Sequence, residues 1–408
     1  MFKKCSFILF VLIVCFSITA GCADHGRETY KIDPLKEKII IGQVVSLTGQ
    51  LAFGVSVSSG PVYDMWVEDV NNQGGIFVKE YGKKLPIEYI KYDDKSDADT
   101  MEKLLSKLIL EDKVDFLLPP WGTTFLYTAA AIANKHEYIL IGGAGGAIEL
   151  KEAVADMKYF FSTLNHADTQ MPVLVDILEE LAIKSVTISF VQDLHGVEYA
   201  GTLVPELLAR GIDVKIVKGH PEGTQDFVPL LNQAKGYNSE AFLAFVYPGD
   251  AMNIVTQSIE NNFNFDVFLL SVCPIFGFFR DVLGAEAVEG IMGTGAWNTK
   301  SLFCAGDFYE KYVRYFGEEP DFWGSLVYYA SLEHLQQAIE EAGTLDQRAI
   351  RDILATRIYD TCIGPFSYDN GTFIGHLGQI GQWQNGIFEV IDPGSNRTAA
   401  PKIKPKWM

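Results

Sequence analysis

Small or polar residues follow directly after an apolar run at five places in this chain, and such turns can bind a small ligand through the main chain. The first is residues 39–54, where an isoleucine-rich run leads into Ser46, Thr48, Gly49 and Gly54. A continuous apolar run is typical of a parallel strand that is buried on both faces. Backbone N–H groups stay accessible where the next helix begins, and they hydrogen-bond to anions. The pattern predicts a strand end that captures a small solute.

Two more of these loops lie in the first half of the chain. Residues 117–124 place Trp121 and Gly122 ahead of two threonines, whose hydroxyls suit the cap of the alanine-rich helix that follows. Residues 141–147 contain four glycines within five positions, so a ligand can approach the main chain closely. Trp121, which lies between a proline and a glycine on a loop, has little reason to be a core residue.

The last two loops hold the matching positions in the second half of the chain. They are residues 192–196, which contain His195, and residues 246–250, which contain Tyr247 and Asp250. Glycine and proline in any one of these loops are equally well explained as simple turn formers. Because the loops fall at equivalent strand ends, we favour one shared ligand site.

The elements that must position these loops are visible as strand-length apolar runs alternating with stretches of helical periodicity. This α/β alternation predicts parallel sheets, and ligands of open α/β sheets bind beyond the carboxyl ends of the strands. Strands are expected at residues 39–45, 85–91, 114–118, 138–142, 185–191, 212–217, 241–247, 267–271 and 290–295. Helices are expected at residues 56–72, 98–111, 123–135, 168–182, 197–210, 226–235 and 249–262.

The N-terminus has the composition of an export signal. Lys3 and Lys4 precede an apolar stretch over residues 5–18 that is shorter than the roughly 20 residues of a membrane-spanning helix. Residues 1–21 are therefore expected to be a signal peptide. No later segment is long and apolar enough to span a membrane, so we expect an exported, soluble body.

Residues 18–22, Ile-Thr-Ala-Gly-Cys, resemble the bacterial lipobox, in which the cysteine is acylated, although Thr19 stands where leucine is usual. This predicts lipidation at Cys22, with residues 22–38 as a polar tether. The protein would then be anchored in the periplasm or at the cell surface. The alternative is an ordinary signal peptide with an incidental cysteine.

Acidic residues outnumber basic residues by 52 to 33, which gives the chain a net charge of −19. Removal of residues 1–21 takes Lys3 and Lys4 away and changes this charge to −21. A chain this acidic is a poor partner for nucleic acid. The chain has 408 residues, of which 48% are hydrophobic, and is longer than the chains that fold around a single hydrophobic core. Two lobes are therefore expected.

Cys273, Cys304 and Cys362 remain in the folded body, and their spacing matches no metal site. We interpret them as small buried residues, and one disulfide between two of them stays open as an alternative. Phosphate-binding loops, zinc-protease motifs and serine nucleophile elbows are absent from the sequence. We therefore expect a protein that is not an enzyme and that needs no metal or cofactor.

Four motifs make the chain resemble the periplasmic solute-binding proteins typified by the Leu/Ile/Val-binding protein of branched-chain amino acid ABC transporters. The resemblance spans essentially residues 39–390. The motifs are Ser46-Leu47-Thr48-Gly49 with Ala52-Phe53-Gly54, Asn72-Gln73-Gly74-Gly75-Ile76, Tyr92-Asp93-Asp94-Lys95-Ser96-Asp97, and Ile363-Gly364-Pro365-Phe366-Ser367-Tyr368-Asp369.

The resemblance implies the type I periplasmic binding fold, an α/β architecture of two Rossmann-like lobes joined by three crossovers. We expect the crossovers near residues 161–164, 293–297 and 360–363. Lobe one would comprise residues 39–161 and 297–360, and lobe two residues 162–293 and 363–400. Closure of the lobes about this hinge would enclose the ligand, and the closed form would engage a membrane permease.

The resemblance also implies which residues contact the ligand. An aromatic contact from the first loop maps to Phe53, and amides and hydroxyls of the next two loops would hold a carboxylate. His195 stands where the family often has a tyrosine, although it could equally be a turn or surface residue, and Tyr247 matches an aromatic residue of the cleft. The expected ligand contacts are Phe53, Trp121, Gly122, Thr123, Ala144, Gly145, Gly146, His195, Tyr247, Asp250 and Phe276.

Residues 271–276 depart from the amino-acid binders of this family, which carry there a glutamate that pairs with the ligand ammonium. An unpaired, sheltered ammonium would cost several kcal/mol. Either Asp250 takes this role, or the ligand is not an ordinary α-amino acid. Gly146 also replaces a usual hydroxyl residue. We therefore expect a carboxylate- or amide-bearing solute with an apolar or aromatic body.

Two roles are open for such a chain. As the binding component of an importer, it would be a monomer that passes its ligand to ABC permease subunits. As a sensor, it would report occupancy to a signalling partner. The lipid anchor favours transport, and the sequence leaves the identity of the ligand open.

Overall fold

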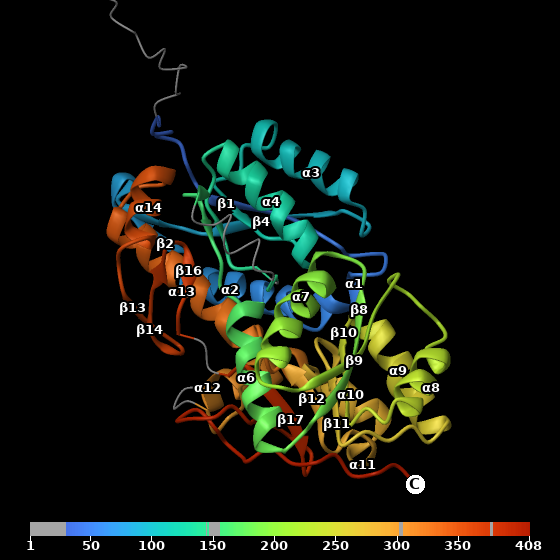
Figure 1. The fold of residues 1–408 in the computed structure, drawn as a ribbon. Coiled ribbons are helices and arrows are strands. Elements are labelled where there is room, and N and C mark those ends of the chain that lie inside the picture. The colour runs from blue at the N-terminus through green and yellow to red at the C-terminus, as the bar shows by residue number, and fades with distance from the viewer. Residues whose placement is uncertain (1–29, 144, 147–155, 302–304, 376–377) are drawn as a thin grey trace, which may run out of the picture. The chain divides into compact units, whose positions relative to one another are not determined.

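The structure is a computed structural model, and it describes residues 30–143, 145–146, 156–301, 305–375 and 378–408. The chain divides into two compact units, Met1–Asp33 and Pro34–Met408. The fold described below is that of Pro34–Met408 (Figure 1). Among the described residues, no helix combines the length and the apolar character that a membrane crossing requires.

The first sheet has five strands in the order β4-β1-β5-β6-β7, and every neighbouring pair is parallel. Its strands are β1 Ile39–Val45, β4 Ile87–Asp93, β5 Phe116–Leu118, β6 Leu140–Ile141 and β7 Phe160–Phe161. The helices that alternate with them are α1 Ala52–Ser56, α2 Ser59–Asn72, α3 Ala98–Leu110 and α4 Thr123–Lys135. Because side chains alternate along a strand, Ile41 packs in a core with α2 while Val44 packs in a core with α3 and α4.

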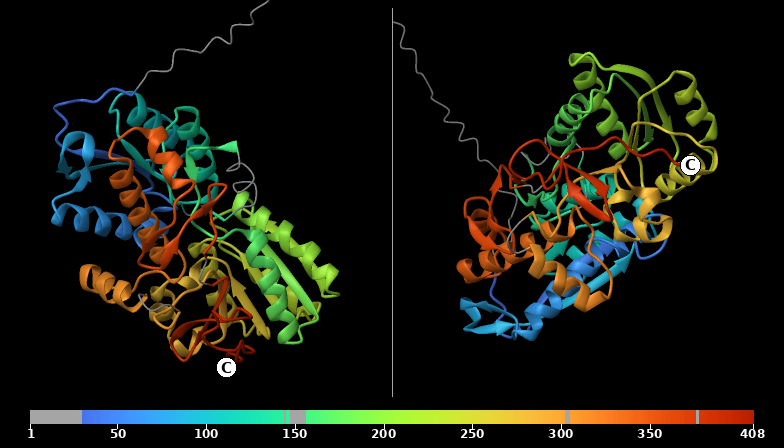
Figure 2. Two further views of the ribbon diagram at one scale, coloured as in Figure 1. Left: turned by 90° about the vertical axis from the view of Figure 1, so that its left-hand side faces the viewer. Right: turned by 90° about the horizontal axis from the view of Figure 1, so that it is seen from below.

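The second sheet has seven strands in the order β18-β17-β12-β11-β10-β8-β9. Its pairs are parallel from β9 to β12, whereas β17 and β18 add antiparallel strands at one edge. Its strands are β8 Ser185–Val191, β9 Asp213–His220, β10 Ala241–Phe245, β11 Val267–Leu270, β12 Ile291–Thr294, β17 Ile380–Gln384 and β18 Ile387–Val390. Residues of α6 Ala167–Glu180 and α7 Leu194–Ala209 form the core on one face, and residues of α8 Val228–Gly236 and α9 Pro248–Glu260 contribute to the core on the other (Figure 2).

The remaining elements are short or come late in the chain. They are β2 Ile76–Val78, the 3₁₀ turn η1 Lys79–Tyr81, β3 Lys83–Leu85, the 3₁₀ turn η2 Cys273–Ile275, α10 Gly277–Leu283, α11 Ala285–Val288, α12 Ala305–Phe316, α13 Ser325–Ala342, α14 Gln347–Leu354, β13 Tyr359–Thr361, β14 Gly364–Phe366, β15 Tyr368–Asp369 and β16 Thr372–Phe373. Of these, α13 is almost wholly buried at its first two turns and packs in the core of the first sheet.

The predicted α/β fold with parallel sheets is confirmed. The strands expected at residues 39–45 and 185–191 and the helix expected at residues 123–135 have the predicted bounds. The antiparallel edge formed by β17 and β18, and the helices after residue 304, are features that the periodicity analysis did not identify.

One segment runs directly from the first sheet to the second, and two more run between the second sheet and elements that pack in the core of the first. Hydrogen bonds join these segments. The N–H of Phe373 donates to the carbonyl of Ser162 at 2.9 Å, and the N–H of Gly295 donates to the carbonyl of Gln379 at 2.5 Å. Phe366 and Phe373 pack in the core of the first sheet. We therefore propose that each sheet is the centre of one lobe, with the third crossover after Phe373, later in the chain than residues 360–363.

Glycine at position 196 is required where the start of α7 lies against the end of β8. A Cβ at this position would overlap the carbonyl oxygen of Val191, whereas a Cβ at Gly201, in the same helix, would have nothing within 4 Å. We predict that Gly196→Ala lowers the free energy of unfolding by about 1–3 kcal/mol through overpacking. The matched variant Gly201→Ala should be neutral or gain up to about 1 kcal/mol. Urea denaturation of both variants measures this, and equal midpoints would contradict the packing.

Candidate functional site

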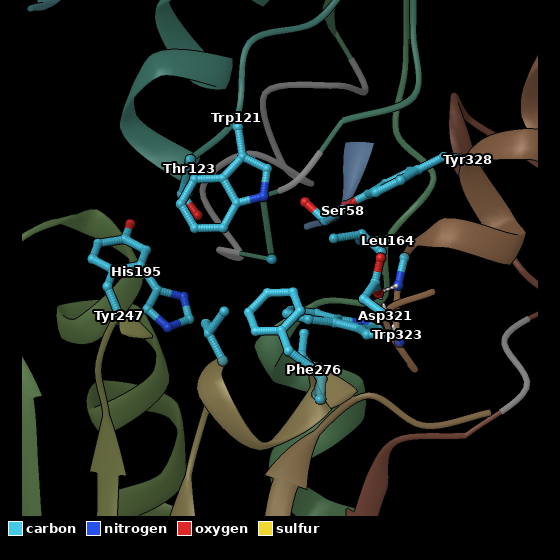
Figure 3. A pocket seen from close by; sticks show the side chains of 16 residues that line it. Ser58, Trp121, Thr123, Leu164, His195, Tyr247, Phe276, Asp321, Trp323 and Tyr328 are labelled. Atoms are coloured by element: carbon cyan, nitrogen blue, oxygen red, sulfur yellow. Dashed lines mark hydrogen bonds between the residues drawn. The ribbon is translucent and has the colours of Figure 1, made fainter. Parts of the chain in front are cut away.

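Two adjoining cavities lie between the two sheets, and Trp121 and Tyr247 line both of them. The inner cavity has a volume of about 30 Å³ and the outer cavity about 570 Å³. The inner cavity is lined by Ser58, Trp121, Gly122, Thr123, Gly145, Gly146, Leu164, His195, Tyr247, Val272, Ile275, Phe276, Asp321, Trp323, Gly324 and Tyr328 (Figure 3). The outer cavity is lined by Gln50, Leu51, Phe53, Gly54, Trp121, Glu222, Gly223, Gln225, Tyr247, Pro248, Gly249, Asp250, Met252 and Phe278.

The loop between β5 and α4 brings main-chain donors to the inner cavity. Gly122 has φ of +98°, a conformation that glycine adopts without strain, and it is followed at once by the first turn of α4. No side chain caps this helix, so its first N–H groups keep their hydrogen-bonding capacity for another acceptor. Gly145 and Gly146 line the same cavity. This wall of the cavity can therefore hold an anionic or carbonyl oxygen.

Aromatic rings close the site from both sheets. The rings of Trp121 and Tyr247 lie 5.7 Å apart, and His195 stacks on Tyr247 at 5.4 Å. At the outer rim, Phe53, which is 43% exposed, meets Phe278 edge to face at 4.6 Å. In Figure 3, Trp121 lies across the cavity from His195 and Phe276. A ligand between these rings would be shielded from water on its apolar faces.

Hydrogen bonds hold the side chains of Tyr247 and His195, which follow strands of the second sheet, in place. The hydroxyl of Tyr247 donates to Asp193 Oδ2 at 2.7 Å, and Asp193 Oδ1 accepts from the N–H of Gly196 at 3.0 Å. His195 Nε2 lies 3.0 Å from Ser271 Oγ. Burial lowers the pKa of His195, and burial together with the nearby Asp193 raises the pKa of Tyr247. Both side chains therefore face the cavity uncharged at neutral pH.

Asp321 is a buried carboxyl in the wall of the inner cavity that the sequence analysis did not identify. Its oxygens accept from the N–H groups of Trp323 at 2.9 Å, Gly324 at 2.5 Å and Ser325 at 3.0 Å, and from the hydroxyl of Ser325. Burial raises its pKa in spite of these donors. Because it precedes the first turn of α13 in an Asp-x-x-Gly-Ser pattern, a capping signal could have pointed to it. Its hydrogen bonds give it a structural role.

The structure brings most of the predicted contact residues together. Eight of them line the inner cavity, namely Trp121, Gly122, Thr123, Gly145, Gly146, His195, Tyr247 and Phe276. Phe53 and Asp250 line the outer cavity instead. Ala144 lies outside the described residues, as does Cys22. Whether these residues touch a ligand stays a prediction.

The sequence analysis did not identify several other residues of the inner cavity, because they do not lie in loops that follow predicted strands. Ser58 precedes α2, Leu164 lies in the first connection between the sheets, and Trp323 and Tyr328 lie at the start of α13. Cys273 is wholly enclosed near the cavity and forms no disulfide with another described residue, and Cys304 lies outside the described part of the chain.

Comparison with known proteins gives one family and one fold. The model of a family described as periplasmic binding protein matches residues 38–386. The leucine-binding protein LivK of Thermotoga maritima is 21% identical, with a TM-score of 0.74 over 87% of this chain and 99% of that one. LivJ of Streptococcus pneumoniae, a branched-chain amino acid transporter substrate-binding protein in complex with isoleucine, is 19% identical, with a TM-score of 0.75 over 90% and 100%.

A solute-binding protein of an ABC transporter from Rhodopseudomonas palustris, in complex with 3,4-dihydroxybenzoic acid, is 20% identical, with a TM-score of 0.74 over 91% of this chain and 99% of that one. These matches confirm the resemblance that the four sequence motifs indicated, and with it the type I periplasmic binding fold.

The hydrogen bonds around Ser271 predict the tautomer of His195. Ser271 Oγ accepts from the N–H of Val246 at 2.9 Å, and the carbonyl of Val246, 3.1 Å away, can accept its proton. We predict that the Ser271 proton is directed to this carbonyl and that His195 donates from Nε2, which leaves Nδ1 as an acceptor. We expect ¹⁵N NMR at pH 6.5 to show a neutral Nε2–H imidazole, assigned by its loss in His195→Gln.

The matched variant Ser271→Ala removes the acceptor and should weaken this tautomer preference. A protonated His195 at pH 6.5, or an Nδ1–H tautomer in the unmodified protein, would contradict the hydrogen-bond network.

Proposed function

We propose, since this chain belongs to the periplasmic binding protein family, that it captures a small carboxylate- or amide-bearing solute outside the cytoplasm and delivers it to an ABC importer. The family match covers residues 38–386, and therefore both cavities and every strand of the two sheets except β18. The chain would act by binding its solute unchanged and not as an enzyme. No cofactor is needed for this role.

The proposal rests on one observation: two walls of the inner cavity face each other and differ in their chemistry. On one side, the uncapped first turn of α4 and the glycines Gly145 and Gly146 offer main-chain amides. On the other, the neutral side chains of His195 and Tyr247 face the same space. Helix-end amides can hold an anionic oxygen without an arginine, each contact contributing about 0.3–1 kcal/mol or more when it is sheltered.

The apolar walls favour a solute with an aliphatic or aromatic body. Trp121, Tyr247 and Phe276 enclose the cavity, and residues 271–276 supply no acid for an α-ammonium. Among similar folds, one protein was solved with isoleucine and another with 3,4-dihydroxybenzoic acid. The class we propose for this chain is an aromatic or aliphatic acid whose carboxylate lies in the inner cavity and whose body lies in the outer cavity of about 570 Å³. The residues around it would be Phe53, Trp121, Gly122, Thr123, Gly145, Gly146, His195, Tyr247, Asp250 and Phe276.

Capture would proceed by closure of the two lobes about the three connecting segments. Trp121 comes from the loop after β5 and Phe53 from the short helix α1 after β1, whereas Tyr247 and Phe278 come from the starts of α9 and α10. Closure brings these rings together and removes water from the solute, and the closed monomer is the form that permease subunits would bind. Lipidation at Cys22 would hold the protein at the membrane surface in the periplasm or at the cell surface.

Carboxylate recognition is tested with acids and their methyl esters. We expect benzoate and 4-methylpentanoate, which has the carbon skeleton of leucine without its ammonium, to raise the melting temperature of the purified protein by several degrees at millimolar concentration. Their methyl esters should have little effect. The physical reason is that an ester removes the charge that the α4 amides stabilise. Differential scanning fluorimetry at constant ionic strength measures this, and equal shifts for an acid and its ester would refute carboxylate recognition.

Lipid anchoring is tested by replacing Cys22. We expect Cys22→Ala to release the mature protein from the membrane fraction of expressing cells, because a thioether-linked lipid can no longer be attached. Cys273→Ala, which alters a buried cysteine of the folded body, serves as the matched control and should stay in the membrane fraction. Unchanged membrane retention of Cys22→Ala would count against lipidation.

A further inference from the structure

The outer cavity combines acidic side chains with aromatic walls, and it is the roomier of the two. Its volume of about 570 Å³ suits a small organic molecule, whereas the inner cavity is close to the size of one water molecule. Trp121, Tyr247, Phe53 and Phe278 form its apolar walls. Neither Lys nor Arg is among the described residues that line either cavity.

Asp250 is the buried acid of this cavity, and it lacks a full set of partners. It is 1% exposed, in the first turn of α9, and its Oδ1 accepts from the N–H of Gly223 at 3.0 Å. Its Oδ2 has no hydrogen-bond partner among the described residues. A buried carboxylate oxygen without a partner is costly, so this oxygen needs a donor or a positive charge.

His220 does not supply that donor. Its Nδ1 donates to the carbonyl of Pro221 at 3.0 Å, because a carbonyl can only accept. The same nitrogen lies 3.8 Å from Asp250 Oδ2, which is too far for a hydrogen bond. Burial raises the pKa of Asp250, and the His220 ring and the amides of Gly223 and Thr224 only partly offset this effect.

Glu222 adds a second carboxyl on the turn after β9. It makes no hydrogen bond or ion pair with another described residue. Its side chain is largely exposed, but partial desolvation at the cavity, followed by the charges of Asp193 and Asp250, raises its pKa to about 7. A positive charge placed among these carboxyls would relieve their mutual repulsion.

We propose that the outer cavity binds the ammonium group of an organic cation, with Glu222 and Asp250 as its counter-charges and the rings of Trp121, Tyr247 and Phe278 as its walls. Aromatic faces attract cations, and carboxylates form charge-assisted hydrogen bonds with ammonium groups. This inference rests on the proposed function, because the cation would enter the same cleft. The solute would then carry a basic group at the end remote from α4, or be an amine outright.

Two pairs of isosteric probes test the inference by isothermal titration calorimetry. Choline is compared with 3,3-dimethyl-1-butanol, and benzylamine with benzyl alcohol, since the members of each pair share their shape but only the first is charged. We expect at least one cation to bind with a Kd at least tenfold lower than that of its neutral counterpart. Binding of choline points to a quaternary ammonium, and binding of benzylamine alone to a primary one.

Substitution of Glu222, the exposed acid of the outer cavity, tests whether this side chain binds the cation. Glu222→Gln should weaken the preferred cation about tenfold and leave the neutral counterpart unchanged, and folding should be unaffected because this side chain makes no hydrogen bond. Glu260→Gln, at the other end of α9 and exposed, is the matched control and should bind as the unmodified protein does. Asp250→Asn should act like Glu222→Gln, with circular dichroism as a check on its fold.

Equal affinity for charged and neutral probes, or unchanged cation binding by Glu222→Gln, would overturn the inference. Binding of benzoate or 4-methylpentanoate, which carry no ammonium, in the same experiment then keeps the proposed function standing. Cation binding without any response to acids would have the opposite meaning, supporting the ammonium site and refuting carboxylate recognition.

Discussion

The contact between Trp121 and Tyr247 is the interaction on which the arrangement of the site depends. Each ring lies on a loop at the carboxyl end of a strand, one from each sheet, and their centroids are 5.7 Å apart. The pair separates the inner cavity from the outer one, because both residues belong to both linings. Gly54 makes this position of Trp121 possible, since a Cβ there would lie 2.6 Å from the indole ring. The geometry of both cavities follows from where these two rings meet.

The electrostatics of the cleft are unusual because the main chain supplies its positive potential. The first turn of α4 is uncapped and faces the inner cavity, while the carboxyls of Asp321, Glu222 and Asp250 lie in the walls of the two cavities. Asp321 is satisfied by the amides of α13, but Asp250 is not fully satisfied. Donors at one end and acceptors at the other create a gradient of potential along the cleft. A solute with one charged or polar group at each end fits this gradient best.

The sequence predicted the parallel part of the fold well because a buried parallel strand is a continuous apolar run, as at residues 39–45 and 185–191. The loops that follow such runs could therefore be located, and they supplied Trp121, Thr123, His195 and Tyr247 to the cavity. The late elements could not be located in this way. Strands such as β14 and β16 have two or three residues, too few to show a period, and their Phe366 and Phe373 find their place only through packing with distant helices.

The same limit explains the missed part of the site. Asp321, Trp323 and Tyr328 lie at the start of α13, which enters the cavity without a preceding strand, so the rule about strand ends did not apply to them. Their proximity to His195 arises from tertiary contacts across some 130 residues of sequence, which no local pattern encodes. The boundaries of the lobes are hard to predict for the same reason. They depend on whether each segment near the C-terminus packs with the first or the second sheet, which the local sequence does not show.

Trp323 gives the connecting segments a mechanical property. Its Nε1 donates to Asn165 Oδ1 at 2.5 Å in the first connection, and its ring lies against Gly295 in the second. Asn165 in turn donates to the carbonyl of Gly378 at 3.1 Å in the third. If each sheet is the centre of one lobe, as we propose, a rotation of one lobe relative to the other would bend these three segments together. Trp323 also lies in the wall of the inner cavity, so a solute bound there would contact the residue that ties these segments together.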